Sequence, residues 1–115
     1  MGLTSMTVAL TVEPTAREEI IAVLRSMVGA TRAEPGCLKV ELSRDVWDAQ
    51  ILYYREEWSS EDHLRRHLDT PVFGKLLTCL ETASAPPEIR FDRIATRRGL
   101  DYITDLRDAA GEIGA

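Results

Sequence analysis

The feature that most constrains this chain is the order in which two kinds of hydrophobic spacing follow each other. Apolar and polar residues alternate in four stretches, 6–12, 38–45, 50–58 and 89–95, as is typical of strands with one buried face. Apolar residues recur at helical spacing between the first two stretches and between the last two, with an interruption at Thr70-Pro71. The order βαββαβ predicts a ferredoxin-like α+β fold, with a four-stranded antiparallel sheet and two helices on one face.

Short local signals mark where the helices begin. Thr15 and Glu18 have the spacing of a capping box, which predicts that the first helix begins at Ala16. Ser59 or Ser60 is predicted to cap the second helix.

Two helices cover only one face of such a sheet, so the other face is expected to have a partner. Ile51, Tyr53, Ile94 and Cys37 are predicted to point from the uncovered face, and a sheet face with bulky side chains is normally covered. We therefore expect a homodimer joined through this sheet face, with a self-complementary twofold interface.

The length of 115 residues fits a single domain. Residues 1–98 are expected to form it. Residues 99–115 form a tail in which Leu100, Ile103 and Leu106 are spaced three apart, which predicts a short helix that packs on the domain or on the dimer partner.

Charge and cysteine content exclude several classes of protein. The net charge of −5 would repel a nucleic acid. Cys37 and Cys79 form no disulfide framework, which indicates a reducing compartment. We recognise neither a signal peptide nor a stretch of membrane-spanning length, so the expected location is the cytoplasm, without a membrane partner.

The side chains with chemical potential gather where the third strand meets the second helix. Tyr54, Glu56 and Trp58 share one strand face, and His67 faces the sheet obliquely from the helix. An unperturbed imidazole has a pKa of about 6.5, so His67 could act as a general base near neutral pH. The alternative is a semi-buried histidine that is satisfied by Glu56 or by a backbone carbonyl.

The other residues of this strand face also allow two interpretations. The two aromatic residues form either a wall for a flat ligand or a part of the core. Glu56 must be paired, hydrated or functional. Its predicted partner is Arg90 or Arg93 of the fourth strand, in a structural ion pair, and the alternative is that it orients His67.

No metal or cofactor is predicted from the motifs. His63 and His67 are four residues apart, but a third ligand is not recognisable. The sequence also lacks a G-x-G-x-x-G motif, a Walker sequence and a nucleophile elbow, so nucleotide cofactors and serine hydrolysis have no support.

The N-terminal strand and helix are followed, in order, by Glu34-Pro35-Gly36-Cys37-Leu38, Glu56-x-Trp58, Leu64-x-x-His67 and Pro71-x-Phe73. This combination resembles the antibiotic biosynthesis monooxygenase family of small dimeric α+β barrel proteins, over residues 5–96. Family members include cofactor-independent oxygenases that act on quinols and polycyclic aromatic phenols, and many members without known activity.

The resemblance implies roles residue by residue. Trp58 matches the tryptophan in the active cavity of polyketide-tailoring relatives, and His67 matches a histidine common in the quinol-oxidising branch. Tyr54 and Leu64 stand where those tailoring relatives have asparagine and tyrosine, and Val72 stands where a second histidine is often found. The implied catalytic residue is His67, and the implied substrate-binding residues are Trp58, Tyr54, Glu56, Leu64, Val72 and Phe73.

By this resemblance the chain is expected to be a cofactor-independent monooxygenase that oxidises an electron-rich phenolic, quinol or polycyclic aromatic substrate with O2. His67 or a bound water would remove a phenolic proton, and the substrate itself would supply the electrons. The alternative is a non-catalytic dimeric barrel that binds a small hydrophobic metabolite or acts as an interaction module. A cavity beside Trp58, Tyr54 and His67 that holds an aromatic ring would distinguish the two.

Overall fold

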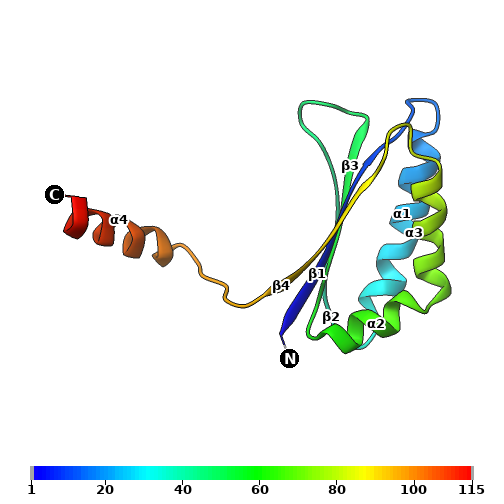
Figure 1. Ribbon diagram of the computed structural model, residues 1–115. Helices are drawn as coiled ribbons and strands as arrows, with labels where there is room; N and C mark the ends of the chain where they lie inside the picture. The colour runs from blue at the N-terminus through cyan, green and yellow to red at the C-terminus, as the bar shows by residue number, and fades with distance from the viewer. Residues whose placement is uncertain (1, 115) are drawn as a thin grey trace.

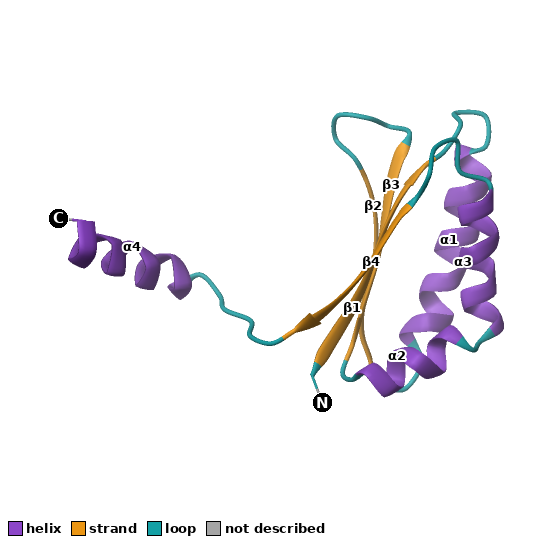
Figure 2. Ribbon diagram, viewed as in Figure 1, coloured by secondary structure: helices purple, strands orange, loops and turns teal. Residues whose placement is uncertain are grey.

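The computed structural model describes residues 2–114 as one antiparallel sheet with three helices on one face and a fourth helix beyond the sheet (Figure 1, Figure 2). The strands lie in the order β2-β3-β1-β4. The elements are β1 (Leu3–Thr11), α1 (Arg17–Arg32), β2 (Cys37–Arg44), β3 (Ile51–Trp58), α2 (Glu61–Leu68), α3 (Pro71–Glu81), β4 (Glu88–Ile94) and α4 (Asp101–Gly114). The predicted ferredoxin-like α+β fold is confirmed, and the second predicted helix is divided into α2 and α3.

The division between α2 and α3 follows from their capping residues. The Ser60 hydroxyl accepts a hydrogen bond from the backbone N–H of His63 at 3.2 Å, and the Thr70 hydroxyl accepts one from Phe73 at 3.4 Å. Each hydroxyl satisfies a donor that the first turn of a helix leaves free, and Pro71 suits the first position because it has no N–H. Of the two predicted caps for α2, Ser60 is therefore the one used.

The predicted capping box at the start of α1 is wrong. The chain turns over residues 14–16, so the helix begins at Arg17, and Ala16 at the N-cap makes no side-chain hydrogen bond. Glu18 and Glu19 lie in the first turn, where negative charge favours a helix through its dipole.

The core lies between the sheet and helices α1 to α3. Val8 of β1 lies opposite Tyr54 of β3, and Leu10 lies opposite Leu52, so these side chains share the face that the helices cover. The buried residues that α1 adds are Ile20, Ile21, Leu24, Met27 and Thr31.

One residue predicted for the uncovered face lies on the other side. The pairing of β2 with β3 shifts between Cys37 and Lys39, so Leu38 is an extra residue that interrupts the alternation. Cys37 consequently pairs with Trp58 and packs against the core. Burial raises the pKa of its thiol, despite the opposing hydrogen bond to Lys39.

The uncovered face carries aromatic, aliphatic and charged side chains. Ile51, Tyr53 and Ile94 belong to this face, because they lie opposite the residues of β1 that alternate with its buried ones. Glu57 is 5% exposed on the same face and is paired with Arg55 at 2.9 Å.

The tail forms a helix that stands apart from the sheet. Figure 1 shows α4 extending from the end of β4 on the side of the sheet that faces away from the other helices. Its packing on a partner subunit stays a prediction.

Candidate functional site

A buried carboxylate, Glu56, is the centre of a hydrogen-bonded cluster on the helix-facing side of β3. It accepts hydrogen bonds from the Tyr54 hydroxyl at 2.6 Å and from the indole N–H of Trp58 at 2.9 Å. His67 Nε2 is 3.0 Å from Oε2 of Glu56, and His67 Nδ1 is 2.9 Å from Oε2 of Glu34. Trp58, Glu56 and His67 are 0% exposed. We call these five residues the carboxylate–histidine cluster.

The surroundings of His67 determine its protonation. Each ring nitrogen faces a carboxylate oxygen, and an ionised carboxylate only accepts hydrogen bonds, so the best arrangement has a proton on both nitrogens. Burial lowers the pKa of His67, but the hydrogen bonds and negative charges of Glu56 and Glu34 outweigh it, and the pKa is raised. The cluster therefore holds a proton more firmly than a free histidine does.

The remaining donors of the cluster also serve Glu56. Burial, and then the charge and hydrogen bond of Glu56, raise the pKa of the Tyr54 hydroxyl, so Tyr54 stays a neutral donor. Glu56 thus accepts from a phenol, an indole and an imidazole. A buried carboxylate with three donors has the partners that burial of a charge requires.

Local structure explains how the cluster is assembled. The alternation of β3 places its three members on one face, and α2 supplies His67. Glu34 comes from the turn between α1 and β2, where Gly36 has a φ of +82°. A Cβ atom at Gly36 would lie 2.2 Å from His63 Cγ, so this turn requires glycine for both conformation and space.

The predicted ion pair between Glu56 and the fourth strand is wrong. Arg90 binds Asp92 at 2.8 Å, and Arg93 binds Glu61 at 2.6 Å. The alternative interpretation, in which Glu56 orients His67, agrees with the 3.0 Å contact between them.

Aromatic rings pack around the imidazole. The centroid of the His67 ring is 4.8 Å from that of Trp58 and 5.8 Å from that of Phe73, which meets it edge-on. Val72 is partly buried against the core, and Leu64 is 5% exposed. The structure therefore brings five of the seven predicted residues into one packed and hydrogen-bonded group, namely Tyr54, Glu56, Trp58, His67 and Phe73.

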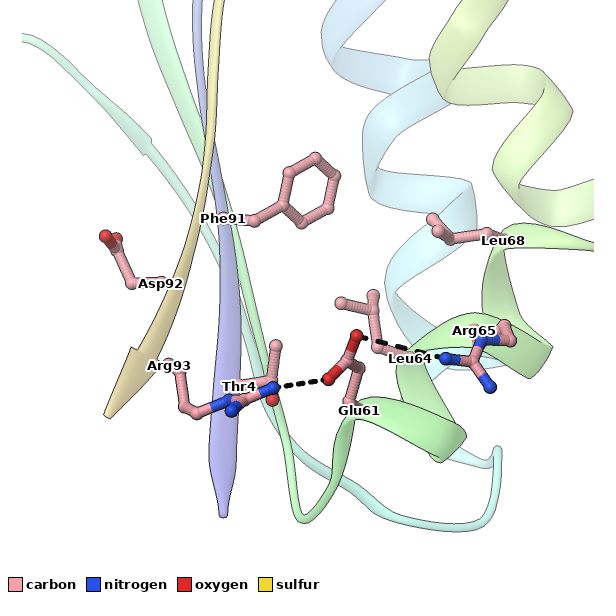
Figure 3. Close-up of a pocket in the computed structure, with 8 residues that line it drawn as sticks. All are labelled: Thr4, Glu61, Leu64, Arg65, Leu68, Phe91, Asp92 and Arg93. Carbon is pink, nitrogen blue, oxygen red and sulfur yellow. Dashed lines mark hydrogen bonds and ion pairs between the residues drawn. The ribbon is translucent and has the colours of Figure 1, made fainter. Parts of the chain in front are cut away.

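A cleft of about 520 Å³ lies beside this cluster, between α2 and β4 (Figure 3). Phe91 points from β4 toward α2, where Leu64 and Leu68 lie. Glu61 lies between two arginines, at 2.6 Å from Arg93 and 3.9 Å from Arg65. The full lining is Thr4, Glu61, Leu64, Arg65, Leu68, Phe91, Asp92 and Arg93.

The cleft and the cluster are separated by the width of one strand. Thr4 of β1 lies opposite Trp58 of β3 on one side and opposite Arg93 of β4 on the other. Neighbouring strands are about 4.8 Å apart, so the cleft begins one strand away from the indole. Of the predicted site residues, all of which the structure describes, Leu64 is the one that lines the cleft.

Sequence reasoning gave no role to several of these residues. Glu34 directly precedes Pro35-Gly36, which predicts a turn. This turn was the one available signal that the Glu34 side chain could point back toward the domain. The sequence places Phe91 in a strand. It does not show whether a helix covers the Phe91 side chain, because that depends on how far α2 extends over the edge of the sheet.

Within residues 2–109, whose side chains the structure describes, no group of three or more His, Cys, Asp or Glu side chains is arranged to hold a metal ion. Among the helices of residues 2–114, none has both the length and the apolar character required to cross a membrane.

Comparison with known proteins gives the family. The family model described as antibiotic biosynthesis monooxygenase matches residues 5–77. The chain belongs to this family. The match contains every member of the carboxylate–histidine cluster and ends before β4, so Phe91 and Arg93 of the cleft, and the whole of α4, lie beyond it.

Individual proteins are similar to this member of the antibiotic biosynthesis monooxygenase family in sequence or in fold. An uncharacterized protein of Synechocystis sp. is 28% identical over 90 residues, which cover 77% of this chain and 61% of that relative. A structure from Mycobacterium tuberculosis has a TM-score of 0.76 and 22% identity, covering 84% of this chain and 99% of the other. A structure named antibiotic biosynthesis monooxygenase has a TM-score of 0.72 and 21% identity, covering 81% and 99%.

Proposed function

We propose that this family member is a cofactor-independent monooxygenase that oxidises an electron-rich phenolic, quinol or polycyclic aromatic substrate with O2. The observation that carries the proposal is the cleft of about 520 Å³, which begins one strand from Trp58, the ring that packs on a buried histidine held by two carboxylates. A cleft of this size accommodates a small aromatic ligand.

In the proposed complex the substrate ring lies against Phe91 and the leucines of α2. Its oxygen points toward Arg93, whose charge stabilises a phenolate. Arg93 is engaged with Glu61 in the free protein, so a bound phenolate would compete with that carboxylate.

The proposed reaction requires no external reductant. For an anthrone, loss of a proton gives an anion that passes one electron to O2, and the two radicals then combine. The ring CH2 becomes a carbonyl: one atom of O2 enters the product, and the other leaves as water with two hydrogens of the substrate.

His67 is the proposed proton acceptor, directly or through a bound water. It accepts a proton only in its neutral form, and the carboxylates that raise its pKa make that form less abundant near pH 7. Activity is therefore expected to increase with pH above the ordinary titration range of histidine, about pH 6.5.

Oxygen uptake with a panel of quinols and anthrones tests the proposal. The expected result is consumption by the unchanged chain, a strong loss in His67→Ala, and a higher KM in Phe91→Ala. Leu77→Ala is the matched control, because Leu77 is 46% exposed on α3 and does not line the cleft. Unchanged turnover in His67→Ala would remove His67 from the mechanism.

A second function, binding without catalysis, is favoured by one specific observation. Trp58 and His67 are 0% exposed and Tyr54 is 2% exposed, so the proposed base has no open access to a ligand. A non-catalytic protein would bind a small hydrophobic metabolite in the same cleft. This function would be selected if calorimetry shows that an anthrone binds while no oxygen is consumed. Phe91→Ala should then lower the affinity for the anthrone by the same factor in the presence and in the absence of O2.

A further inference from the structure

The cleft between α2 and β4 has an apolar end and a charged end. The register of β4 on β1 places Phe91 opposite Met6 and Arg93 opposite Thr4, so the charged end lies nearer the start of β1. The apolar end is completed by two leucines of α2, and the charged end by Glu61 and Arg65 of the same helix. The proposed function uses the apolar end and Arg93, and it gives Arg65 no role.

Two guanidinium groups at the charged end share one carboxylate. Glu61 of α2 is 2.6 Å from Arg93 of β4 and 3.9 Å from Arg65, one turn further along its own helix. Figure 3 shows the Glu61 carboxylate between the two guanidinium groups. Arg65 has a nearer second partner in Asp62, at 3.2 Å, but Asp62 does not line the cleft. Glu61 is therefore the anion that the cleft itself offers to both arginines.

The other acidic residue of the lining is directed elsewhere. Asp92 points away from α2 in Figure 3 and binds Arg90 at 2.8 Å. The charged side chains that line the cleft on its ligand side are then two arginines and one carboxylate. In a chain with a net charge of −5, this local excess of positive charge favours an anionic ligand.

The ion pairs of the charged end are easy to rearrange. The side chains of Arg93 and Arg65 are 71% and 68% exposed, and that of Glu61 is 54% exposed. Exposed pairs of this kind contribute little to stability, so a carboxylate of a ligand can replace Glu61. The same exposure keeps the ligand carboxylate in contact with water, which avoids the penalty of burying a charge.

The donors of the two arginines suit two neighbouring oxygen groups on one ring. A guanidinium group has five N–H donors in a planar fork, so Arg93 can serve a phenolic oxygen and a carboxylate oxygen together. Arg65 can donate to the other carboxylate oxygen. Both arginines lie at the same end of the cleft, so the hydroxyl and the carboxylate must lie on the same edge of the ring.

We propose that the charged end of the cleft is a carboxylate subsite, and that the ligand is an aromatic acid with a hydroxyl group on the carbon next to its carboxylate. The ring lies against Phe91, the carboxylate takes the place of Glu61 between Arg65 and Arg93, and Arg93 also holds the hydroxyl oxygen. This inference rests on the proposed function for the position of the ligand, and it adds the substrate class.

Titration calorimetry with two probes of the same shape tests the subsite. The probes are an ortho-hydroxynaphthoate and the corresponding ortho-hydroxynaphthamide, which keeps the hydroxyl but has no charge. At low salt the acid is expected to bind about fivefold more tightly than the amide, or better. Salt should reduce this preference, because the arginines are exposed. Equal binding of both probes, or tighter binding of the amide, would overturn the proposal.

Arg65→Gln tests the subsite separately from the rest of the cleft. This substitution should weaken binding of the acid about two- to fivefold and leave binding of the amide unchanged, which also shows that the cleft is intact. Arg66→Gln is the matched control, because it removes the same charge from the next residue of α2, which does not line the cleft. If both variants weaken the acid equally, general attraction by positive charge explains the binding and the proposal fails.

Glu61→Gln tests the exchange of carboxylates. It frees Arg65 and Arg93 from their shared partner, so the affinity for the acid should rise, whereas the affinity for the amide should not. Glu41→Gln removes the same charge from β2, at the opposite edge of the sheet, and is the control. An acid that binds the Glu61→Gln chain no better than the Glu41→Gln chain would show that Glu61 does not occupy the subsite.

Oxygen uptake with the same probes separates this inference from the proposed function. Uptake with both probes and no preference for the acid would support the oxidation and overturn the carboxylate subsite. The expected preference for the acid with no uptake of oxygen would support the subsite and contradict the oxidation.

Discussion

The carboxylate–histidine cluster and the cleft lie one strand apart on the same face of the sheet, but the charged side chains are buried in the cluster and exposed in the cleft. In the cluster, His67 and Glu56 have fully buried side chains, and each is bonded to groups of complementary character. In the cleft, the side chains of Arg93 and Glu61 form an equally short ion pair but are 71% and 54% exposed. Water competes for the second pair and is excluded from the first.

This difference in exposure predicts that the cluster contributes mainly to folding stability and the cleft mainly to ligand binding. Removing one partner of a buried ion pair strongly destabilises the fold, because the remaining charge is buried without a partner or water. An exposed ion pair contributes about 0–1 kcal/mol to stability. An exposed pair is correspondingly easy to rearrange around a ligand. We infer that substitutions in the cluster mainly change the free energy of unfolding, and that substitutions in the cleft mainly change ligand affinity.

The largest effect is expected for Glu56→Ala. It removes the acceptor for Tyr54, Trp58 and His67 together and leaves a cavity, so the free energy of unfolding should decrease by about 3 kcal/mol or more in urea denaturation. Glu41→Ala is the control, because the Glu41 side chain is 50% exposed in a surface ion pair, and its loss should cost less than about 1 kcal/mol. Equal losses in the two variants would contradict the distinction between buried and exposed charge.

A smaller loss is expected for Gly36→Ala, which disturbs the turn that brings Glu34 to His67. The methyl group would overlap the His63 ring in a conformation with φ of +82°, so unfolding should become easier by about 1–3 kcal/mol. Gly29→Ala gives the matched comparison, since nothing lies within 4 Å of its new Cβ inside α1. That variant should gain about 0.5–1 kcal/mol. Thermal denaturation that moves both variants in the same direction would argue against strain at Gly36.

These sites also show how far the sequence alone could predict the structure. The alternation of β3 correctly places Tyr54, Glu56 and Trp58 on one face, because a strand has a fixed period of two. The same rule misplaces Cys37, because the extra residue at Leu38 changes the register and leaves no mark in the hydrophobic pattern. Local periodicity is therefore reliable until a bulge interrupts it.

Contacts between distant segments were harder to predict. His67 and Glu34 are 33 residues apart, and their meeting depends on the exact path of the turn at Gly36. The cleft depends on α2 leaving part of β4 uncovered, which is a property of helix placement and not of any one segment. Arg93 failed as the predicted partner of Glu56 for this reason, since helix α2 supplied His67 for Glu56 and Glu61 for Arg93. Arg90 failed because it lies opposite Thr7, on the uncovered face, whereas Glu56 lies opposite Met6, on the covered one.

The pH dependence of stability tests the charge state of the cluster. The folded state raises the pKa of His67 above its value of about 6.5 in the unfolded chain, so it binds the proton more tightly. The resulting stabilisation is complete below about pH 6.5 and is lost as the pH rises through the raised value. The difference in unfolding free energy between the unchanged chain and His67→Gln should therefore shrink as the pH rises above about 6.5. A difference that stays constant would mean that folding does not change the pKa of His67, and one that grows with pH would mean that His67 is neutral when folded.

The smallest effect on stability is expected in the cleft. Phe91 is 48% exposed, so Phe91→Ala removes limited burial and should change the free energy of unfolding by only about 1 kcal/mol. Its effect on the binding of an aromatic ligand should be about 0.5–1.5 kcal/mol, a roughly two- to tenfold change in affinity, because the substitution removes a ring contact. Titration calorimetry with an anthrone measures this, with Leu77→Ala as the control of similar exposure outside the cleft. If Leu77→Ala weakens binding as much as Phe91→Ala does, the ligand does not occupy the space between α2 and β4, and the division between a stabilising cluster and a binding cleft is wrong.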